Sequence, residues 1–271
     1  MRVNQAFAIF SVFASFLAIL GLARTQASRP PANPANSPSA PVIVELFTSE
    51  GCSSCPPADA LLKKLGEEAS LPGVEIIALE EHVDYWDHLG WKDRFSSSVF
   101  TERQNEYARK FGSDGVYTPQ MVVDGQTEFV GSRSREAREV IQKAVAQPKL
   151  TISLKPSPGN ERDEVGFDIK VGNLAVLSNG KEAELWVAIT EKNLHTDVKA
   201  GENSGERLQH AAVVRSLRKV DTFRSAADYQ THSAAKLDPS WQRENLNFVA
   251  FAVEKSSQKI IGAASEKVLQ R

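Results

Sequence analysis

The fold expected for this chain follows from residues 42–57, Val42-Ile43-Val44-Glu45-Leu46-Phe47-Thr48-Ser49-Glu50-Gly51-Cys52-Ser53-Ser54-Cys55-Pro56-Pro57. The first six of these residues are mostly apolar and β-branched, which is typical of a buried strand. A helix is expected to follow, because apolar residues recur at helical spacing and two prolines stand at its start, where missing amide hydrogens are tolerated. The apolar positions are Ala58, Leu61, Leu62 and Leu65.

The alternation of strand and helix patterns continues to residue 147. Residues 74–79 predict a second strand, and a helical connection makes it a parallel neighbour of the first, so that the carboxyl ends of both strands share one edge. A second helix is expected up to Gly112, then a hairpin around Asp124-Gly125-Gln126 and a third helix through residue 145. This order predicts a layered α/β domain over residues 42–147.

A different pattern follows Pro148. Apolar residues alternate with a period of two at 165–171, 185–189 and 246–253, which indicates strands. The prediction for residues 148–271 is an all-β, antiparallel, sandwich-like domain. Its loop from residue 191 to 207 is expected to be solvated, because the spacing of its polar residues matches no metal motif. These residues are His195, Asp197, Glu202 and Glu206, with His210 beyond.

The N-terminal segment is predicted to direct export. Residues 6–22 are apolar or small and Thr25-Gln26-Ala27 suits a signal peptidase, so residues 1–27 are interpreted as a signal peptide. The alternative is a retained membrane anchor, since this apolar run reaches the lower limit for a helical span. Residues 28–41 carry five prolines among small polar residues and predict an extended linker. The mature protein is therefore expected to be periplasmic or secreted.

Composition narrows the range of partners. Among 271 residues, 32 Lys and Arg stand against 34 Asp and Glu, so no basic excess is present to bind a phosphate backbone. Nucleic acid is not expected as a partner, and a membrane is expected only if the N-terminal segment is not cleaved. The two cysteines of the chain would be exported to a compartment where disulfides persist.

The pair Cys52 and Cys55 predicts thiol–disulfide chemistry. Its spacing allows a disulfide to close at a helix start, where amide dipoles favour a thiolate. Cys52 is the candidate nucleophile because it lies at the outer end, where solvent and a partner reach it, and Cys55 is placed to resolve a mixed disulfide. Glu50 and Asp59 are nearby charges that oppose thiolate formation. The alternatives are half of a zinc site, for which no second pair exists, and a purely structural disulfide.

Two further motifs carry a resemblance. Residues 46–55 resemble the strand, loop and CxxC of glutaredoxins in the thioredoxin superfamily, and Thr118-Pro119 resembles the cis-proline turn that faces the cysteines there. More closely, residues 45–131, with His82-Val83-Asp84-Tyr85-Trp86 and Val116-Tyr117-Thr118-Pro119-Gln120, are similar to a secreted thioredoxin-like family catalogued as a domain of unknown function, DUF1223.

The resemblance implies a fold and roles for several residues. It implies a thioredoxin-like β-α-β-α-β-β-α domain over residues 42–147, in which Cys52 attacks and Cys55 resolves. Thr118 and Pro119, together with Tyr117, would shape the substrate groove. The chain departs from thioredoxin in having no Trp before Cys52, and in carrying two prolines after Cys55 where a basic residue is usual.

Residues 80–91 leave the second strand at its carboxyl end and are expected on the same edge as Cys52. His82 and Asp84 are auxiliary candidates that can shuttle a proton, and His82 with both thiolates can hold a soft metal such as copper. The interpretation that we favour is structural: the aromatic residues of this stretch, including Trp86, pack as a lid on the core while the polar residues face water.

Taken as one chain, the sequence predicts an exported thiol–disulfide oxidoreductase that acts on protein thiols or disulfides without a cofactor or a resident metal. Cys52 and Cys55 are its catalytic pair. The first alternative is a copper-binding or copper-carrying protein that uses Cys52, Cys55 and His82. The second is a redox-inactive scaffold whose disulfide only holds the helix start.

Overall fold

The structure is a computed structural model that describes residues 40–67, 74–159, 161, 163–177, 181–224 and 229–268. The predicted signal peptide, and the predicted linker up to residue 39, lie outside these residues. Within the described ranges, no helix is both long and apolar enough to cross a membrane.

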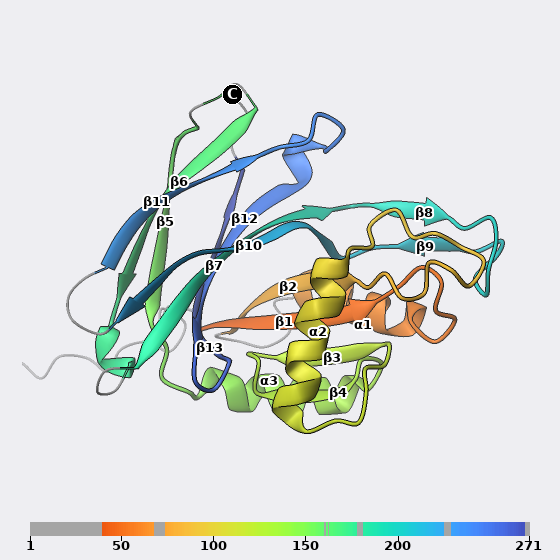
Figure 1. The fold of residues 1–271 in the computed structure, drawn as a ribbon, viewed down its shortest axis with the longest axis horizontal. Helices are drawn as coiled ribbons and strands as arrows, with labels where there is room; N and C mark the ends of the chain where they lie inside the picture. Colours follow the sequence, from red (N-terminus) through yellow and green to blue (C-terminus); the bar gives the residue numbers. More distant parts are fainter. Residues whose placement is uncertain are drawn as a thin grey trace, which may run out of the picture. The chain divides into compact units, whose positions relative to one another are not determined.

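Eight strands form one mixed sheet (Figure 1). They are β1 (Ala40–Thr48), β2 (Val74–His82), β3 (Gln120–Val123), β4 (Thr127–Val130), β7 (Glu182–Lys192), β10 (Ala212–Arg224), β12 (Leu246–Glu254) and β13 (Lys259–Lys267). Their order across the sheet is β13-β12-β7-β10-β2-β1-β3-β4. β1 and β2 are parallel, as the sequence predicts, and β10 joins the other edge of β2 in parallel through the pair Val213–Glu80. The remaining neighbours are antiparallel.

Three helices cover the part of the sheet around β1. Side chains of a strand alternate between the two faces of a sheet. Val44 and Leu46 of β1 therefore pack with α1 and α3 on one face, whereas Ile43 and Phe47 pack with α2 on the other. The helices are α1 (Pro56–Glu67), α2 (Ser98–Phe111) and α3 (Ser134–Val145). From β1 to α3 the elements follow the predicted order of strand, helix, strand, helix, hairpin and helix.

The other strands form two smaller sheets. A three-stranded sheet of order β11-β6-β5 packs on the large sheet, and Phe167 in it stacks on Phe248 of β12 with ring centroids 4.2 Å apart. A hairpin of β8 and β9 reaches toward the start of α1 (Figure 1). The strands are β5 (Thr151–Pro158), β6 (Glu164–Gly172), β8 (His195–Asp197), β9 (Arg207–Gln209) and β11 (Tyr229–Lys236). Short 3-10 helices occur at Leu174–Val176 and Arg243–Asn245.

The predicted fold class is wrong. The sequence predicts an α/β thioredoxin-like domain followed by an all-β sandwich, but the described residues form a mostly β structure of thirteen strands and three α-helices. β7, β10, β12 and β13 extend the sheet of β1 to β4. A buried cluster accordingly joins Ile43 and Leu79 with Val214, Val249 and Phe251. Local periodicity predicts a strand but not the edge that the strand joins, and here β10 pairs with β2 across the predicted boundary.

Candidate functional site

The disulfide loop connects β1 to α1. Cys52 and Cys55 are bonded to each other, with their Cα atoms 5.4 Å apart. The Cys52 amide donates to the Ser49 carbonyl at 3.1 Å, and the Cys55 amide donates to the Cys52 carbonyl at 3.1 Å. The chain thus turns twice before Pro56 and Pro57 open α1. The disulfide that the spacing of the two cysteines allows is present.

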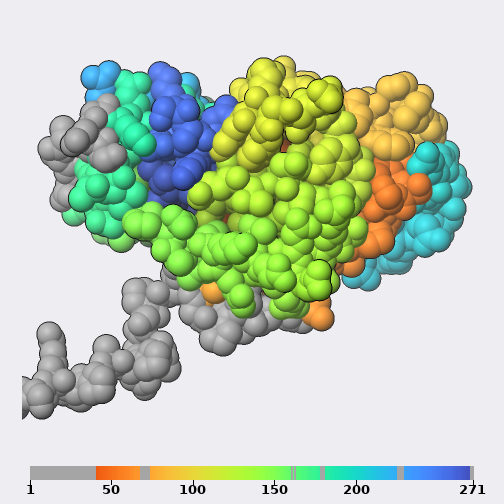
Figure 2. Space-filling model, turned by 90° about the horizontal axis from the view of Figure 1, so that it is seen from below, coloured from red at the N-terminus to blue at the C-terminus, as the bar shows by residue number. Residues whose placement is uncertain are grey.

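The β8–β9 hairpin covers the disulfide loop. The side-chain amide of Asn203 donates to the carbonyls of Glu50 and Cys52, at 2.9 and 3.0 Å. The Ser53 amide donates to a carboxylate oxygen of Glu202 at 3.1 Å. In Figure 2 the cyan surface of this hairpin lies directly against the orange surface that contains the disulfide loop and α1. Residues far apart in the sequence therefore bond to the backbone of the disulfide loop.

This cover contradicts one expectation and agrees with another. Cys52 was expected to be accessible to solvent, but both cysteines are 0% exposed. The polar residues of the loop from residue 191 to 207 that were expected to be solvated, His195, Asp197, Glu202 and Glu206, are all exposed, although Asn203 in the same loop is buried. The reason is a long-range contact that spacing within the loop cannot indicate: Asn203 bonds to backbone carbonyls 153 and 151 residues earlier.

Trp86 lies between the disulfide loop and the turn at Pro119. The Thr118–Pro119 peptide bond is cis, as the resemblance implies. The indole nitrogen of Trp86 donates to the Thr118 hydroxyl at 2.9 Å. On its other side Trp86 packs against Gly51, where an added Cβ would lie 3.4 Å from the Cβ of Trp86. One aromatic side chain therefore contacts the residue before Cys52 and the residue before Pro119.

Gly131 lets the proline turn approach α1. A Cβ at this position would lie 3.0 Å from the Cβ of Ala58 in the first turn of α1, and 3.2 Å from the Cβ of Pro119. The Gly131 amide donates to the Pro119 carbonyl at 2.9 Å. Pro119 therefore lies beside the helix start that the disulfide precedes.

Tyr117 and Asp84 make their contacts with α2 and β4. The Gln104 amide donates to the Tyr117 carbonyl at 2.7 Å, and the Tyr117 hydroxyl donates to Glu128. Burial, together with the hydrogen bond to Glu128, raises the pKa of Tyr117 well above its ordinary value. The Asp84 carboxylate accepts from the Thr101 hydroxyl at 2.6 Å. Tyr117 thus supports the proline turn, whereas Asp84 holds the loop after β2 on α2.

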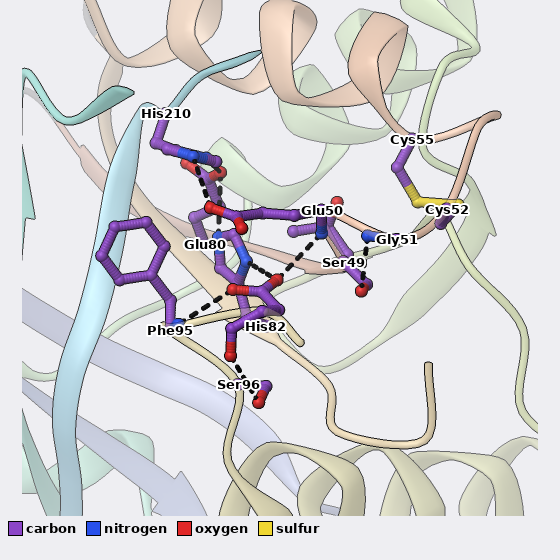
Figure 3. Close-up of polar contacts among 12 residues, drawn as sticks. Ser49, Glu50, Gly51, Cys52, Cys55, Glu80, His82, Phe95, Ser96 and His210 are labelled. Carbon is purple, nitrogen blue, oxygen red and sulfur yellow. Dashed lines mark hydrogen bonds and ion pairs between the residues drawn. A yellow bond between two sulfur atoms is a disulfide. The ribbon is translucent and has the colours of Figure 1, made fainter. Parts of the chain in front are cut away.

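His82 lies in a buried polar cluster close to the disulfide loop (Figure 3). Its Nδ1 is 2.6 Å from Asp93 Oδ2, and its Nε2 is 3.2 Å from Glu80 Oε1. His210 Nδ1 is 2.9 Å from the same oxygen of Glu80, and His210 Nε2 is 3.3 Å from Glu50 Oε1. These five side chains are at most 1% exposed. Glu50 belongs to the disulfide loop, so the cluster and the disulfide share one backbone segment.

The contacts of the cluster determine its charges. Burial alone would lower the pKa of His82, but Asp93 and Glu80 raise it well above its usual value. Burial also opposes protonation of His210, whose polar contacts with Glu50 and Glu80 raise its pKa to about 9. Burial would raise the pKa of Glu80, and the hydrogen bonds from both imidazoles lower it to about 2. The cluster therefore favours protonated imidazoles at His82 and His210 beside an ionised carboxylate at Glu80.

Asp59 is a buried acid next to the disulfide loop. Its amide donates to the Cys55 carbonyl at 3.1 Å, and its carboxyl group accepts from the Thr48 hydroxyl at 2.7 Å. Burial, followed by the charge of Glu80, raises the pKa of Asp59 to about 7. A group that exchanges its proton near neutral pH therefore lies one helical turn from Cys55.

The copper hypothesis requires His82 to offer a ring nitrogen to the two sulfur atoms. Both ring nitrogens of His82 contact carboxylates instead, and the cysteines are bonded to each other. Among the described residues, the group with metal-ligating atoms close together consists of Glu80, His82 and His210. The structure thus separates His82 from the predicted sulfur ligands.

Sequence reasoning gave no role to Asp93, to His210, which it named only beside a loop expected to be solvated, or to Asn203. A signal was available for the first two, because Glu80-Glu81-His82 ends a strand that is predicted to be buried, and buried charges need partners. That signal says that partners exist but not where they lie in the chain. For Asn203 the sequence offers no comparable signal.

Solved structures share this fold. Protein AGR_C_4864 from Agrobacterium tumefaciens is 26% identical, with a TM-score of 0.64 over 87% of this chain and 97% of that one. HBP35 of Porphyromonas gingivalis is 16% identical, with a TM-score of 0.59 over 86% of this chain and 76% of that one, which shows the fold alone. No curated protein matches the chain. The sequence profile described as "Protein of unknown function (DUF1223)" matches residues 43–253, and the chain belongs to this family.

Proposed function

We propose that the protein is an exported thiol–disulfide oxidoreductase in which Cys52 is the nucleophile and Cys55 the resolving residue. The observation that carries the proposal is the position of Trp86, which contacts Gly51 beside Cys52 and Thr118 beside the cis-proline. A disulfide at a helix start thereby adjoins a turn whose backbone can align an extended substrate chain. Thr118 and Pro119 are the proposed substrate-aligning residues, and Tyr117 supports them.

The proposed reaction exchanges one disulfide for another. In the reduced protein the Cys52 thiolate attacks one sulfur of a substrate disulfide, forms a mixed disulfide and releases the other substrate sulfur as a thiolate. The Cys55 thiolate then attacks Cys52 Sγ, closes the disulfide within the protein and releases the second substrate thiolate. The substrate gains two electrons and the protein loses two. The reverse sequence oxidises a substrate dithiol through the same intermediate.

Two features of the site support this chemistry. The start of α1 follows Cys55 directly, and the amide dipoles of a helix start stabilise a thiolate. Asp59, with its pKa raised to about 7 by burial and by Glu80, can take up or give back a proton as Cys55 changes between thiol and disulfide. Both cysteines are fully buried and the β8–β9 hairpin bonds to the loop that carries them, so the proposed reaction needs this hairpin loop to lift.

A structural disulfide is the second candidate, and the complete burial of both cysteines favours it. Equilibration of the purified protein in glutathione buffers of graded potential, with thiols alkylated and counted by mass spectrometry, separates the two. Exchange catalysts have midpoints between about −120 and −270 mV, whereas structural disulfides lie below about −300 mV. A midpoint potential below about −300 mV would refute the oxidoreductase proposal.

Trapping variants test the assigned roles. Cys55→Ser is expected to accumulate mixed disulfides with protein substrates, because Cys52 can attack but nothing resolves the product. Cys52→Ser is expected to form none and to lose turnover. Ser53→Ala is the matched control, since Ser53 lies between the cysteines with an exposed side chain. Equal trapping by both cysteine variants would contradict the assignment of Cys52 as the nucleophile.

A further inference from the structure

Three potential ligand atoms converge inside the protein where β2 meets β10. They are Glu80 Oε1, His82 Nε2 and His210 Nδ1, and all lie within 4.8 Å of one another. The oxygen is 3.2 Å from His82 Nε2 and 2.9 Å from His210 Nδ1. Metal bonds of about 2.0–2.2 Å to N and O ligands place neighbouring ligand atoms roughly 3.0–3.5 Å apart. The two measured separations agree with ligands that share one metal ion.

The surroundings of both histidines match those of metal ligands. A metal-binding imidazole usually donates its second ring N–H to a carboxylate, which fixes the ring and its tautomer. Here His82 Nδ1 faces Asp93 Oδ2 at 2.6 Å, and His210 Nε2 faces Glu50 Oε1 at 3.3 Å. The second oxygen of Glu80 accepts from the amide next to His210. The other polar atom of each side chain therefore faces a partner: Asp93 for His82, Glu50 for His210 and the Ala211 amide for Glu80.

The contact between His210 and Glu50 is also unsatisfied as it stands. Glu50 Oε1 and His210 Nε2 are both buried, and neither makes a well-aligned hydrogen bond to a described residue. The other oxygen of Glu50 accepts from the Trp91 indole at 2.7 Å, which leaves Oε1 directed at the imidazole. When a metal binds to His210 Nδ1, the ring N–H at Nε2 can donate to this buried and unpartnered carboxylate oxygen.

We propose that Glu80, His82 and His210 bind one divalent first-row transition metal of the Zn²⁺ class. Two imidazoles and one carboxylate suit zinc, iron or manganese, whereas Ca²⁺ and Mg²⁺ prefer ligand sets of oxygen alone. The carboxylates of Glu50, Glu80 and Asp93 supply negative charge to a buried cation. The site uses no sulfur, so it differs from a copper site at the cysteines.

The location of the site gives it a structural consequence. The single backbone pair between β2 and β10 is Val213–Glu80. Glu80 and His82 belong to β2, and His210 stands just before β10. A metal bound there would join the two parts of the sheet at their junction. Because binding to the folded state alone stabilises it, the melting temperature should rise with metal concentration.

The test uses the full chain, oxidised and treated with a chelator, and ZnCl₂ as the probe. Competition with a chromophoric chelator gives the Kd, and elemental analysis after desalting gives the stoichiometry. The expected result is one Zn²⁺ per chain while the disulfide stays intact, with a raised melting temperature. Absence of zinc binding by the wild-type chain would overturn the proposal. Co²⁺ is expected to bind without a thiolate charge-transfer band, and such a band would assign the metal to the cysteines instead.

Variants locate the site. Glu80→Gln and His210→Gln retain polar side chains of similar reach and are expected to lose stoichiometric binding. Asp93→Asn keeps all three ligands and should weaken Kd by about 10- to 100-fold through the second contact of His82. His232→Gln is the matched control, because His232 is exposed and pairs with Asp168 on the smaller sheet. Equal zinc affinity in wild type, Asp93→Asn and Glu80→Gln would refute the assignment, and this holds even if His210→Gln fails to fold.

Discussion

Replacement of Asn203 by Ala should accelerate reduction of the Cys52–Cys55 disulfide. A single side-chain amide of Asn203 donates to two carbonyls of the disulfide loop, at 2.9 and 3.0 Å, and Asn203 is buried. The variant leaves these carbonyls under the hairpin without that donor. The covered state is destabilised relative to a state in which the hairpin loop has lifted, whereas the disulfide itself is unchanged.

The size of the effect follows from one carbonyl, that of Glu50, which loses its donor, because the Cys52 carbonyl still accepts from the Cys55 amide. Leaving a buried polar group without its partner costs about 1–3 kcal/mol. A change of this size shifts an equilibrium between two states by about 5- to 150-fold. If reduction occurs only in the open state and closing is fast, the reduction rate scales with the open population. Asn203→Ala should therefore be reduced about 5- to 150-fold faster than the wild type.

The assay is reduction of the oxidised protein by dithiothreitol at fixed pH, with acid quenching, alkylation and mass spectrometry. Ser204→Ala is the control, since its exposed hydroxyl donates to the Lys199 carbonyl within the same loop. Its rate should match that of the wild type. A wild-type rate for a folded Asn203→Ala protein would refute the view that the hairpin limits access, and equal acceleration in both variants would assign the effect to the loop as a whole.

Three other changes test neighbouring contacts. Burial raises the pKa of Asp59 to about 7, so the folded state keeps a proton that the unfolded state releases above about pH 4, and wild-type stability falls as pH rises through this window. Asp59→Asn should therefore gain stability relative to wild type between pH 4 and 8 in urea denaturation. Gly131→Ala places a Cβ 2.7 Å from Leu46 Cδ1 and should lower stability by about 1–3 kcal/mol in the same assay. Trp86→Phe removes the hydrogen bond to Thr118 and should lower the free energy of unfolding by about 0.5–1.5 kcal/mol. This variant should also exchange a peptide disulfide more slowly than the wild type. Unchanged stability in any of the three would count against the contact concerned.

The sequence predicted individual elements because their signals are local. The β-branched run of β1, the helical spacing of α1 and the glycine turn between β3 and β4 each lie within a dozen residues. The arrangement of strands was not predictable in this way. β10 joins β2 through Val213 and Glu80, and only the finished sheet shows that Glu80 also faces His210, 130 positions later in the chain.

The residues of the candidate site also fall into those with a local sequence signal and those that reach the site through long-range contacts. The cysteine pair was recognised because its spacing is a motif, and Trp86 and Thr118 because the resemblance covers residues 45–131. Asn203 and His210 lie outside that range and reach the site through the β8–β9 hairpin. Their types are common in surface loops, so composition gave no reason to prefer them. The charged end of β2 did require buried partners, and His210 is one of them.

The β8–β9 hairpin contributes to both sites, but the structure lets the two contributions move independently. Asn203 lies in the loop, whereas His210 follows β9 and donates its amide to the Leu194 carbonyl at 3.0 Å. Between them the hairpin is closed by three ladder pairs and by the Val198 amide, which donates to the Glu206 carbonyl at 2.9 Å. Residues 199–204 can therefore lift from the disulfide without breaking the ladder.

This division has a consequence for the buried cluster. Glu50 is where the two sites meet, because its carbonyl accepts from Asn203 while its amide donates to Asp93 at 2.8 Å and its carboxylate faces His210. Opening of the loop removes the contact to this carbonyl and the packing of Gly201 against Trp91, whose indole donates to the carboxylate. The Glu50 amide still faces Asp93 and its carboxylate still faces His210, so we expect the ligand geometry at His82 and His210 to persist while the disulfide is exposed. Disulfide exchange and metal binding are thus expected to be separable in one molecule, with Glu50 as their common anchor.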